Sequence, residues 1–138
     1  MKISARIQNS RANHQVTLTT DDRVRPLPIP PKVTGLGSSV NGGELLFLAL
    51  ATCYCNDLYR EAAKRAIRVE SVEVEVRGEF GAEGEPARQV TYHARVEAAA
   101  SEEDIRDLMR HTDGVAEIQN TLGAGTPVTL SRIEAATM

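Results

Sequence analysis

The sequence predicts an α+β fold in which antiparallel hairpins pack against one long central helix. Two stretches alternate apolar and polar residues as antiparallel strands do, and a helix-length apolar run lies between them. Two shorter helical patterns follow the second stretch. Strands that occur in hairpins, with helices between and after them, indicate a largely antiparallel sheet and an α+β class.

The N-terminal part is predicted to form a hairpin and then a long loop. Ile3 and Ile7 alternate with polar residues and the pattern resumes at Val16 after a polar turn, so residues 1–20 are expected to form the hairpin. Residues 21–40 contain four of the six prolines and are interpreted as an irregular loop. Loops of this length are usually functional or pack on a neighbour.

The central helix is predicted over residues 41–66. Asn41 is expected to be its N-cap, with Glu44 completing a capping box. The first half is apolar on every side and is therefore expected to be buried all round, whereas the second half is amphipathic. The polar side of this second half comprises Asp57, Arg60, Glu61, Lys64 and Arg65.

The C-terminal part is predicted to contain a second hairpin, two short helices and a strand. Residues 69–98 alternate strictly around a turn rich in Gly, Glu and Ala, as a hairpin with one exposed face does. Residues 101–138 are expected to form two short helices and a final strand at 128–133. Ser101 is expected to cap the first short helix, and a break at 111–114 to separate it from the second.

Size and charge limit the class of protein. The chain has 138 residues and 41% hydrophobic content, which fits one domain over residues 1–138. Sixteen basic and nineteen acidic residues give a net charge of -3 without a basic cluster, so no nucleic-acid partner is expected. The apolar runs fall well short of the roughly 20 residues that span a bilayer, and the N-terminus lacks a signal-like segment. A cytoplasmic protein without membrane association is therefore expected.

Both cysteines lie in the central helix, on different sides of it. Cys53 and Cys55 point about 200° apart, so a disulfide between them would break the helix. Cys55 continues the apolar stripe and is expected to be a small core residue. Cys53 lies over Asn56, Asp57 and Arg60, where a partly accessible thiol could occur. Its reactivity would require the thiolate, and a second buried, inert cysteine is the alternative.

The remaining polar candidates do not predict a metal site or a cofactor. His14, His93 and His111 lack the paired, short spacing that zinc sites show, also when combined with the cysteines. His93 is expected to be a surface ion partner. His111 is explained by a helix C-terminus, with a position near a pocket as the second possibility. Tyr59, on the apolar stripe, is expected to lie in the core.

Several segments together resemble the OsmC/Ohr family. They are residues 41–46 (Asn-Gly-Gly-Glu-Leu-Leu), 51–53 (Ala-Thr-Cys), 67–74, and 115–122 followed by a Gly-containing turn. The resemblance implies an intertwined homodimer with the central helices buried in its middle. It also implies the reduction of organic hydroperoxides. A cysteine on the central helix attacks the peroxide and becomes a sulfenic acid, the first stage of thiol oxidation. A second cysteine then converts this sulfenic acid to a disulfide.

The family's residues carry over only in part. Cys53 matches the cysteine that attacks the peroxide. The resolving cysteine would fall at residues 111–115, at Asp113, which is expected to be the N-cap of the second short helix instead. The family's assisting glutamate would fall at Gly43, one residue before Glu44.

The family's assisting arginine has no motif to place it. The candidates are Arg23 and Arg25 in the loop, with Arg11 as a further possibility.

These matches and losses predict a homodimeric protein of the stress-response type that has lost dithiol peroxidase chemistry. It is expected to bind a small apolar or thiol-containing ligand in a dimer-interface pocket near Cys53. The residues expected to line this pocket are Glu44, Asn56, Tyr59, His111 and Asp113. The alternative is a one-cysteine, thiol-dependent organic hydroperoxide reductase, or a redox sensor, that uses Cys53.

Overall fold

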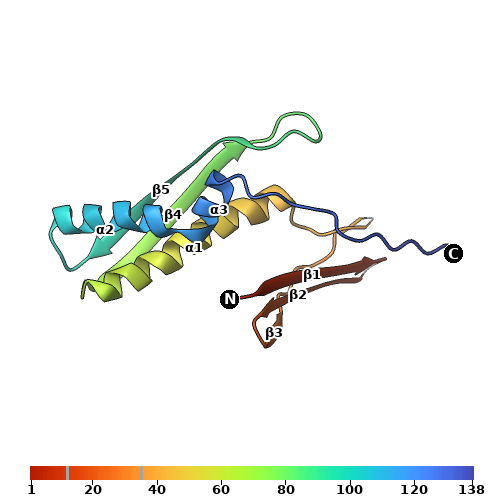
Figure 1. Ribbon diagram of the computed structural model, residues 1–138, viewed down its shortest axis with the longest axis horizontal. Helices are drawn as coiled ribbons and strands as arrows, with labels where there is room; N and C mark the ends of the chain where they lie inside the picture. Colours follow the sequence, from red (N-terminus) through yellow and green to blue (C-terminus); the bar gives the residue numbers. More distant parts are fainter. Residues whose placement is uncertain (12, 35) are drawn as a thin grey trace. The chain divides into compact units, whose positions relative to one another are not determined.

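The computed structural model describes residues 1–11, 13–34 and 36–138. These form two compact units, Met1–Leu46 and Phe47–Met138 (Figure 1). Each unit is described by itself, and the single domain expected over residues 1–138 stays a prediction.

The first unit begins with the predicted hairpin. β1 (Ile3–Ser10) and β2 (Asn13–Thr20) pair antiparallel, with Ile7 opposite Val16. The alternating pattern of residues 1–20 therefore identified both strands correctly. Among the described residues of this hairpin, Val16 is the buried one, and one hydrophobic face is what the alternation requires.

A third strand corrects the irregular loop predicted over residues 21–40. β3 (Arg23–Pro26) pairs antiparallel with β2, and the sheet order is β1-β2-β3. The reversal before it uses Asp21 at a positive φ of 50°, a backbone region that Asp tolerates better than most residues. Pro26 ends an edge strand, where a missing N–H removes no internal ladder bond.

The central helix α1 (Gly42–Lys64) closely follows the predicted range 41–66. Its capping box is confirmed. The Asn41 backbone N–H donates to Glu44 Oε1 over 2.9 Å, and the Glu44 N–H donates to Asn41 Oδ1 over 2.8 Å. The helix stops where Ala66 takes a positive φ of 54°, the left-handed geometry with which many helices end.

The second hairpin is also confirmed. β4 (Val69–Glu79) and β5 (Arg88–Ala98) pair antiparallel within the predicted range 69–98. Glu75 lies opposite His93 on the exposed face, as the alternation indicated. The other face carries the valines and packs on the helices.

Two helices follow, but the break between them lies later than predicted. The Ser101 hydroxyl accepts the Asp104 N–H over 3.1 Å and caps α2 (Glu102–Val115). α2 continues through residues 111–114, and only Ala116 separates it from α3 (Glu117–Gly123).

The polar residue Thr112 does not interrupt α2, because its hydroxyl group has a hydrogen-bond partner within the helix. Thr112 is fully buried, and its hydroxyl donates to the Leu108 carbonyl oxygen over 2.8 Å, one turn earlier. This back-bonding removes the cost of burying a free hydroxyl inside a helix. Asp113 consequently lies within α2, and the prediction that it caps the next helix was wrong.

The strand predicted at 128–133 is not formed. Residues 126–138 are all described and contain no strand. Val128, Leu130 and Ile133 are 98%, 80% and 78% exposed. An alternating apolar segment becomes a strand only beside a sheet edge that accepts it, and no described strand pairs with this one.

The core of the second unit lies between the helices and one face of the β4–β5 hairpin (Figure 1). Its buried residues are Tyr54, Leu58 and Ala62 from α1 and Leu108 from α2. The hairpin contributes alternate residues of its inner face, which are Val72, Val74, Tyr92, Ala94 and Val96. Among the described residues, no helix combines the length and the apolar character needed to span a membrane.

Burial along α1 differs from the sequence prediction. In one chain the apolar half is not covered all round, since Leu48 is 60% exposed. Tyr59 is 45% exposed and not a core residue; the core tyrosine is Tyr54, whose hydroxyl donates to the Met109 carbonyl over 3.0 Å. Conversely, Asp57 and Glu61 from the expected polar side are buried, because α2 and α3 cover that side.

Candidate functional site

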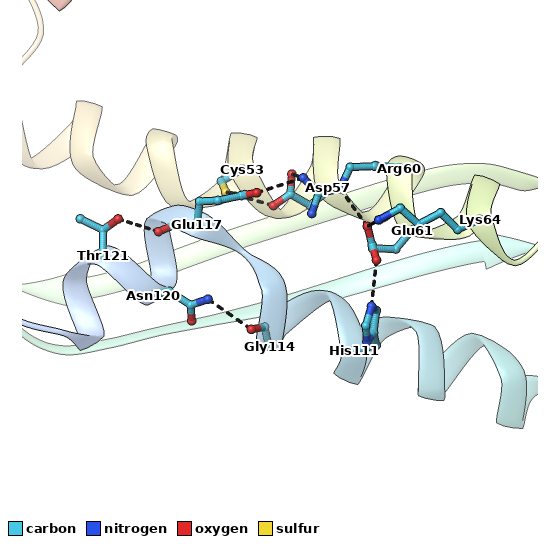
Figure 2. A network of polar contacts seen from close by, with 10 residues as sticks. All are labelled: Cys53, Asp57, Arg60, Glu61, Lys64, His111, Gly114, Glu117, Asn120 and Thr121. Atoms are coloured by element: carbon cyan, nitrogen blue, oxygen red, sulfur yellow. Dashed lines mark hydrogen bonds and ion pairs between the residues drawn. The ribbon is translucent and has the colours of Figure 1, made fainter. Parts of the chain in front are cut away.

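A thiol and two carboxylates follow each other along one side of α1. Cys53, Asp57 and Glu61 are four residues apart, so they share the same helix face. The half-buried Cys53 thiol donates to Asp57 Oδ2, with Sγ and Oδ2 3.4 Å apart. Its sulfur also lies 3.7 Å from Oε2 of Glu117, the first residue of α3 (Figure 2).

Arg60 joins these acidic groups. Its Nη1 lies 3.1 Å from Asp57 Oδ1 and 3.1 Å from Glu117 Oε1, while its Nε lies 2.8 Å from Glu61 Oε2. One guanidinium therefore connects α1 with the start of α3 and binds carboxylates on both sides of itself (Figure 2). Its planar group of donors suits such multiple contacts better than a lysine would.

The far end of the network is built on Glu61. This carboxylate accepts hydrogen bonds from three side chains. They are Arg60 Nε, Lys64 Nζ over 2.9 Å and His111 Nε2 over 2.8 Å. The hydrogen bond from Arg60, followed by those from Lys64 and His111, lowers the pKa of Glu61 to about 2. His111 therefore joins α2 to α1 and has Glu61, not the thiol, as its partner.

The acidic surroundings oppose ionisation of the thiol. Burial raises the pKa of Cys53, and the hydrogen bond to Asp57 and the charges of Asp57 and Glu117 raise it further; a backbone hydrogen bond from Ile118 acts in the opposite direction. Cys53 is thus a neutral thiol at rest, held beside a proton acceptor.

The two carboxylates next to the thiol differ in proton affinity. Burial, and then the hydrogen bond with Glu117, raise the pKa of Asp57. The hydrogen bond with Asp57, aided by Arg60, lowers the pKa of Glu117 to about 2. Asp57, the buried member of the pair, therefore takes up a proton more readily than Glu117 does.

The same atoms include metal-ligand types. One ligand atom each from Cys53, Asp57 and Glu117 lie within 4.8 Å of one another. Arg60 already supplies positive charge to both carboxylates at hydrogen-bond distance. The sequence prediction of no metal site considered the histidines, and it stays a prediction.

Cys55 lies in a different environment. It lines an open pocket of about 280 Å³. The other residues of this pocket are Ala51, Thr52, Asn56, Val72 and Val74. Asn56 is thus the predicted pocket residue that lines this pocket, which adjoins Cys55 and the β4 strand.

The other predicted site residues are distributed over the structure. Glu44 closes the capping box of α1. Asp113, at the position of the missing resolving cysteine, accepts a hydrogen bond from the Tyr92 hydroxyl. Arg23 and Arg25 lie on β3 in the first unit and Cys53 lies in the second, so a role for either arginine beside the thiol stays a prediction.

The sequence placed Asp57 beside Cys53, but it did not indicate that Asp57 is buried or that Glu117 lies near the thiol. Asp57 was placed below the thiol but on a solvent-facing side, and Glu117 was not considered. The four-residue spacing of Cys53, Asp57 and Glu61 was the available signal. What it lacked was the knowledge that α2 and α3 cover this face.

The fold is that of an α+β protein with a cysteine on its central helix, and in this chain the thiol lies beside a buried carboxylate. The family model described as OsmC-like protein matches residues 35–131, and the chain belongs to this family. The predicted resemblance is thereby confirmed. A comparison with curated proteins found no match.

Solved structures of the family share the fold. An OsmC-like protein from Mycoplasma pneumoniae is 21% identical, with a TM-score of 0.60 and 87% of each chain covered. An organic hydroperoxide resistance protein from Elizabethkingia anophelis is 16% identical, with a TM-score of 0.59 over 88% of this chain and 87% of that one. One from Legionella pneumophila is 20% identical, with a TM-score of 0.57 over 88% and 89%.

Proposed function

We propose that this protein is a homodimeric, one-cysteine reductase of organic hydroperoxides that uses Cys53 and an external thiol. The observation that carries the proposal is the contact of a half-buried Cys53 with the Asp57 carboxylate, 3.4 Å away. A core cysteine packs among apolar groups, whereas this sulfur has a proton acceptor beside it.

The substrate class is supported by similar proteins. Two of the similar solved structures are described as organic hydroperoxide resistance proteins. At this low sequence identity, the structural likeness shows a common fold, and the substrate class is carried over by analogy. The proposal assigns the same class of substrate to Cys53.

An external reductant is part of the proposal because the chain offers no resolving thiol. Cys55 lies on another side of α1, and Asp113 stands where the resolving cysteine would fall. A sulfenic acid on Cys53 would react with one small thiol to a mixed disulfide, and a second thiol would regenerate Cys53. The family's two-cysteine cycle is lost in this account.

The homodimer is supported by the uncovered side of α1. Leu48 and Tyr59 belong to the apolar stripe of α1, yet they are 60% and 45% exposed. A second chain would cover this stripe. A cytoplasmic location belongs to the same proposal, since two free thiols persist best in a reducing compartment.

The test is turnover of cumene hydroperoxide with dithiothreitol as reductant. The wild type is expected to consume peroxide, Cys53→Ser to lose this activity, and the matched control Cys55→Ser to keep it. Equal activity in wild type and Cys53→Ser contradicts the proposal.

A second candidate function is binding of a small apolar or thiol-containing ligand without turnover. It is favoured by the open pocket of about 280 Å³ beside Cys55, with its apolar wall of Val72 and Val74. Saturable binding by a protein that consumes no peroxide would support it. A redox sensor would instead form the Cys53 adduct and not turn over.

A further inference from the structure

We propose that Asp57 is a catalytic residue, the group that takes the proton from Cys53 and returns it to the leaving alkoxide; this rests on the proposed hydroperoxide reduction. The residue sequence favours the arrangement. Asp57 follows Cys53 by four residues on α1, so the helix itself holds the carboxylate next to the sulfur, one turn further along.

The two oxygens of Asp57 have separate tasks. Oδ1 lies 3.1 Å from Arg60 Nη1, whereas Oδ2 lies 3.4 Å from the Cys53 sulfur. Arg60 therefore fixes the carboxylate plane and leaves one oxygen for the thiol. In this account Arg60 is a positioning residue, because it acts on the sulfur through Asp57.

Burial distinguishes Asp57 from the second carboxylate at the thiol. Glu117 is 3.7 Å from the sulfur and its side chain is 62% exposed, whereas the side chain of Asp57 is 10% exposed. A proton held by a buried carboxyl exchanges with the thiol before it exchanges with water. Glu117 would hold its charge and stabilise the guanidinium of Arg60, with which it pairs over 3.1 Å.

The proposed step balances in atoms and electrons. The Asp57 carboxylate accepts the Cys53 proton, and the thiolate attacks the terminal oxygen of the hydroperoxide ROOH. The S–O bond forms as the O–O bond breaks, and the alkoxide RO⁻ takes the proton from Asp57. The products are Cys53 sulfenic acid and the alcohol ROH, with sulfur oxidised and the peroxide reduced by two electrons.

The opposing explanation is that Asp57 only suppresses the thiolate. A negative carboxylate next to sulfur disfavours a second negative charge. If that were its whole effect, removing the charge would accelerate every reaction of the Cys53 thiolate. The two explanations therefore differ in sign for a reaction whose leaving group needs a proton.

The experiment compares two reagents on Cys53 of the full-length wild type and of Asp57→Asn. Iodoacetamide needs only the thiolate, since iodide leaves without a proton, whereas cumene hydroperoxide releases an alkoxide. Asp57→Asn is expected to be alkylated faster and to form sulfenic acid at least about tenfold more slowly. Both rates are measured at Cys53 by mass spectrometry, with dimedone to trap the sulfenic acid.

Two further variants separate a catalytic carboxylate from a structural one. Asp57→Glu keeps a carboxyl group on this helix face and is expected to restore part of the hydroperoxide rate. Asp107→Asn removes an exposed carboxylate of α2 that contacts Arg110, and it is expected to behave like the wild type. Far-UV circular dichroism verifies that each variant is folded.

The outcomes distinguish the two proposals. If the wild type forms no sulfenic acid, the proposed function fails and the proton transfer fails with it. If the wild type reacts and Asp57→Asn reacts as fast or faster, the role of Asp57 alone is overturned. The same holds if Asp57→Glu restores nothing although it is folded.

Discussion

The two flanks of α1 place two cysteines of one helix in opposite environments. The charged flank, defined here as Cys53, Asp57 and Glu61, lies under α2 and α3 and is crossed by Arg60. The apolar flank, Leu48, Cys55 and Tyr59, is partly uncovered and adjoins an open pocket. The two cysteines are two residues apart, yet Cys53 has the Asp57 carboxylate as its neighbour and Cys55 has the apolar wall of a pocket.

The largest expected effect comes from Leu58, a core residue between the two flanks of α1. Leu58 of α1 is completely buried in the core that α1 forms with α2 and the hairpin, so Leu58→Ala leaves a cavity. We expect it to lower the free energy of unfolding by about 3 kcal/mol, measured by urea denaturation. Leu108→Ala, the corresponding change in α2, should cost a similar amount; a loss below about 1 kcal/mol for both would contradict this packing.

The next largest effect concerns the apolar flank and the proposed homodimer. Leu48→Asp places a charge where a second chain is expected to cover α1, and desolvating it should weaken the dimer by at least about a hundredfold. Light scattering coupled to size exclusion measures this. Thr91→Asp on the exposed face of the hairpin is the control, and a dimer unaffected by Leu48→Asp argues for another interface.

A smaller effect concerns the charged flank in acid. The pKa of Glu61 is lowered from 4.5 to about 2 in the folded chain. Its contribution to stability is therefore complete above about pH 4.5 and is lost as the pH falls towards 2. Melting temperatures between pH 2 and 7 should decline less steeply for Glu61→Gln than for the wild type. Parallel curves would show that the contacts of Glu61 with Arg60, Lys64 and His111 contribute nothing.

The smallest expected effect is the resting reactivity of the thiol on the charged flank. Because burial and Asp57 raise the pKa of Cys53, less thiolate is present at pH 7 than in a free thiol. We expect iodoacetamide to modify Cys53 a few times more slowly than it modifies glutathione. Faster modification would mean that the backbone hydrogen bond from Ile118 outweighs burial and the two carboxylates.

Local sequence signals predicted the parts of the fold whose causes are local. Alternation gave the strands of both hairpins, and Asn41 with Glu44 gave the start of α1. Helical periodicity also separated Cys53 from Cys55 and placed Asp57 below Cys53. Each of these depends on residues a few positions apart.

The errors concern features that depend on distant partners. Arg23–Pro26 becomes a strand because β2 offers an edge, and residues 128–133 form none because no described edge receives them. Asp57 and Glu61 look solvent-exposed until α2 and α3 cover them. Tyr59 lies on the apolar stripe, yet the core takes Tyr54 instead.

The most direct test of the central claim is to treat the wild-type protein briefly with cumene hydroperoxide and dimedone and to map both cysteines in the same sample by mass spectrometry. We predict a sulfenic acid adduct on Cys53 and an unmodified Cys55. An adduct mainly on Cys55, or a disulfide between positions 53 and 55, would contradict this claim.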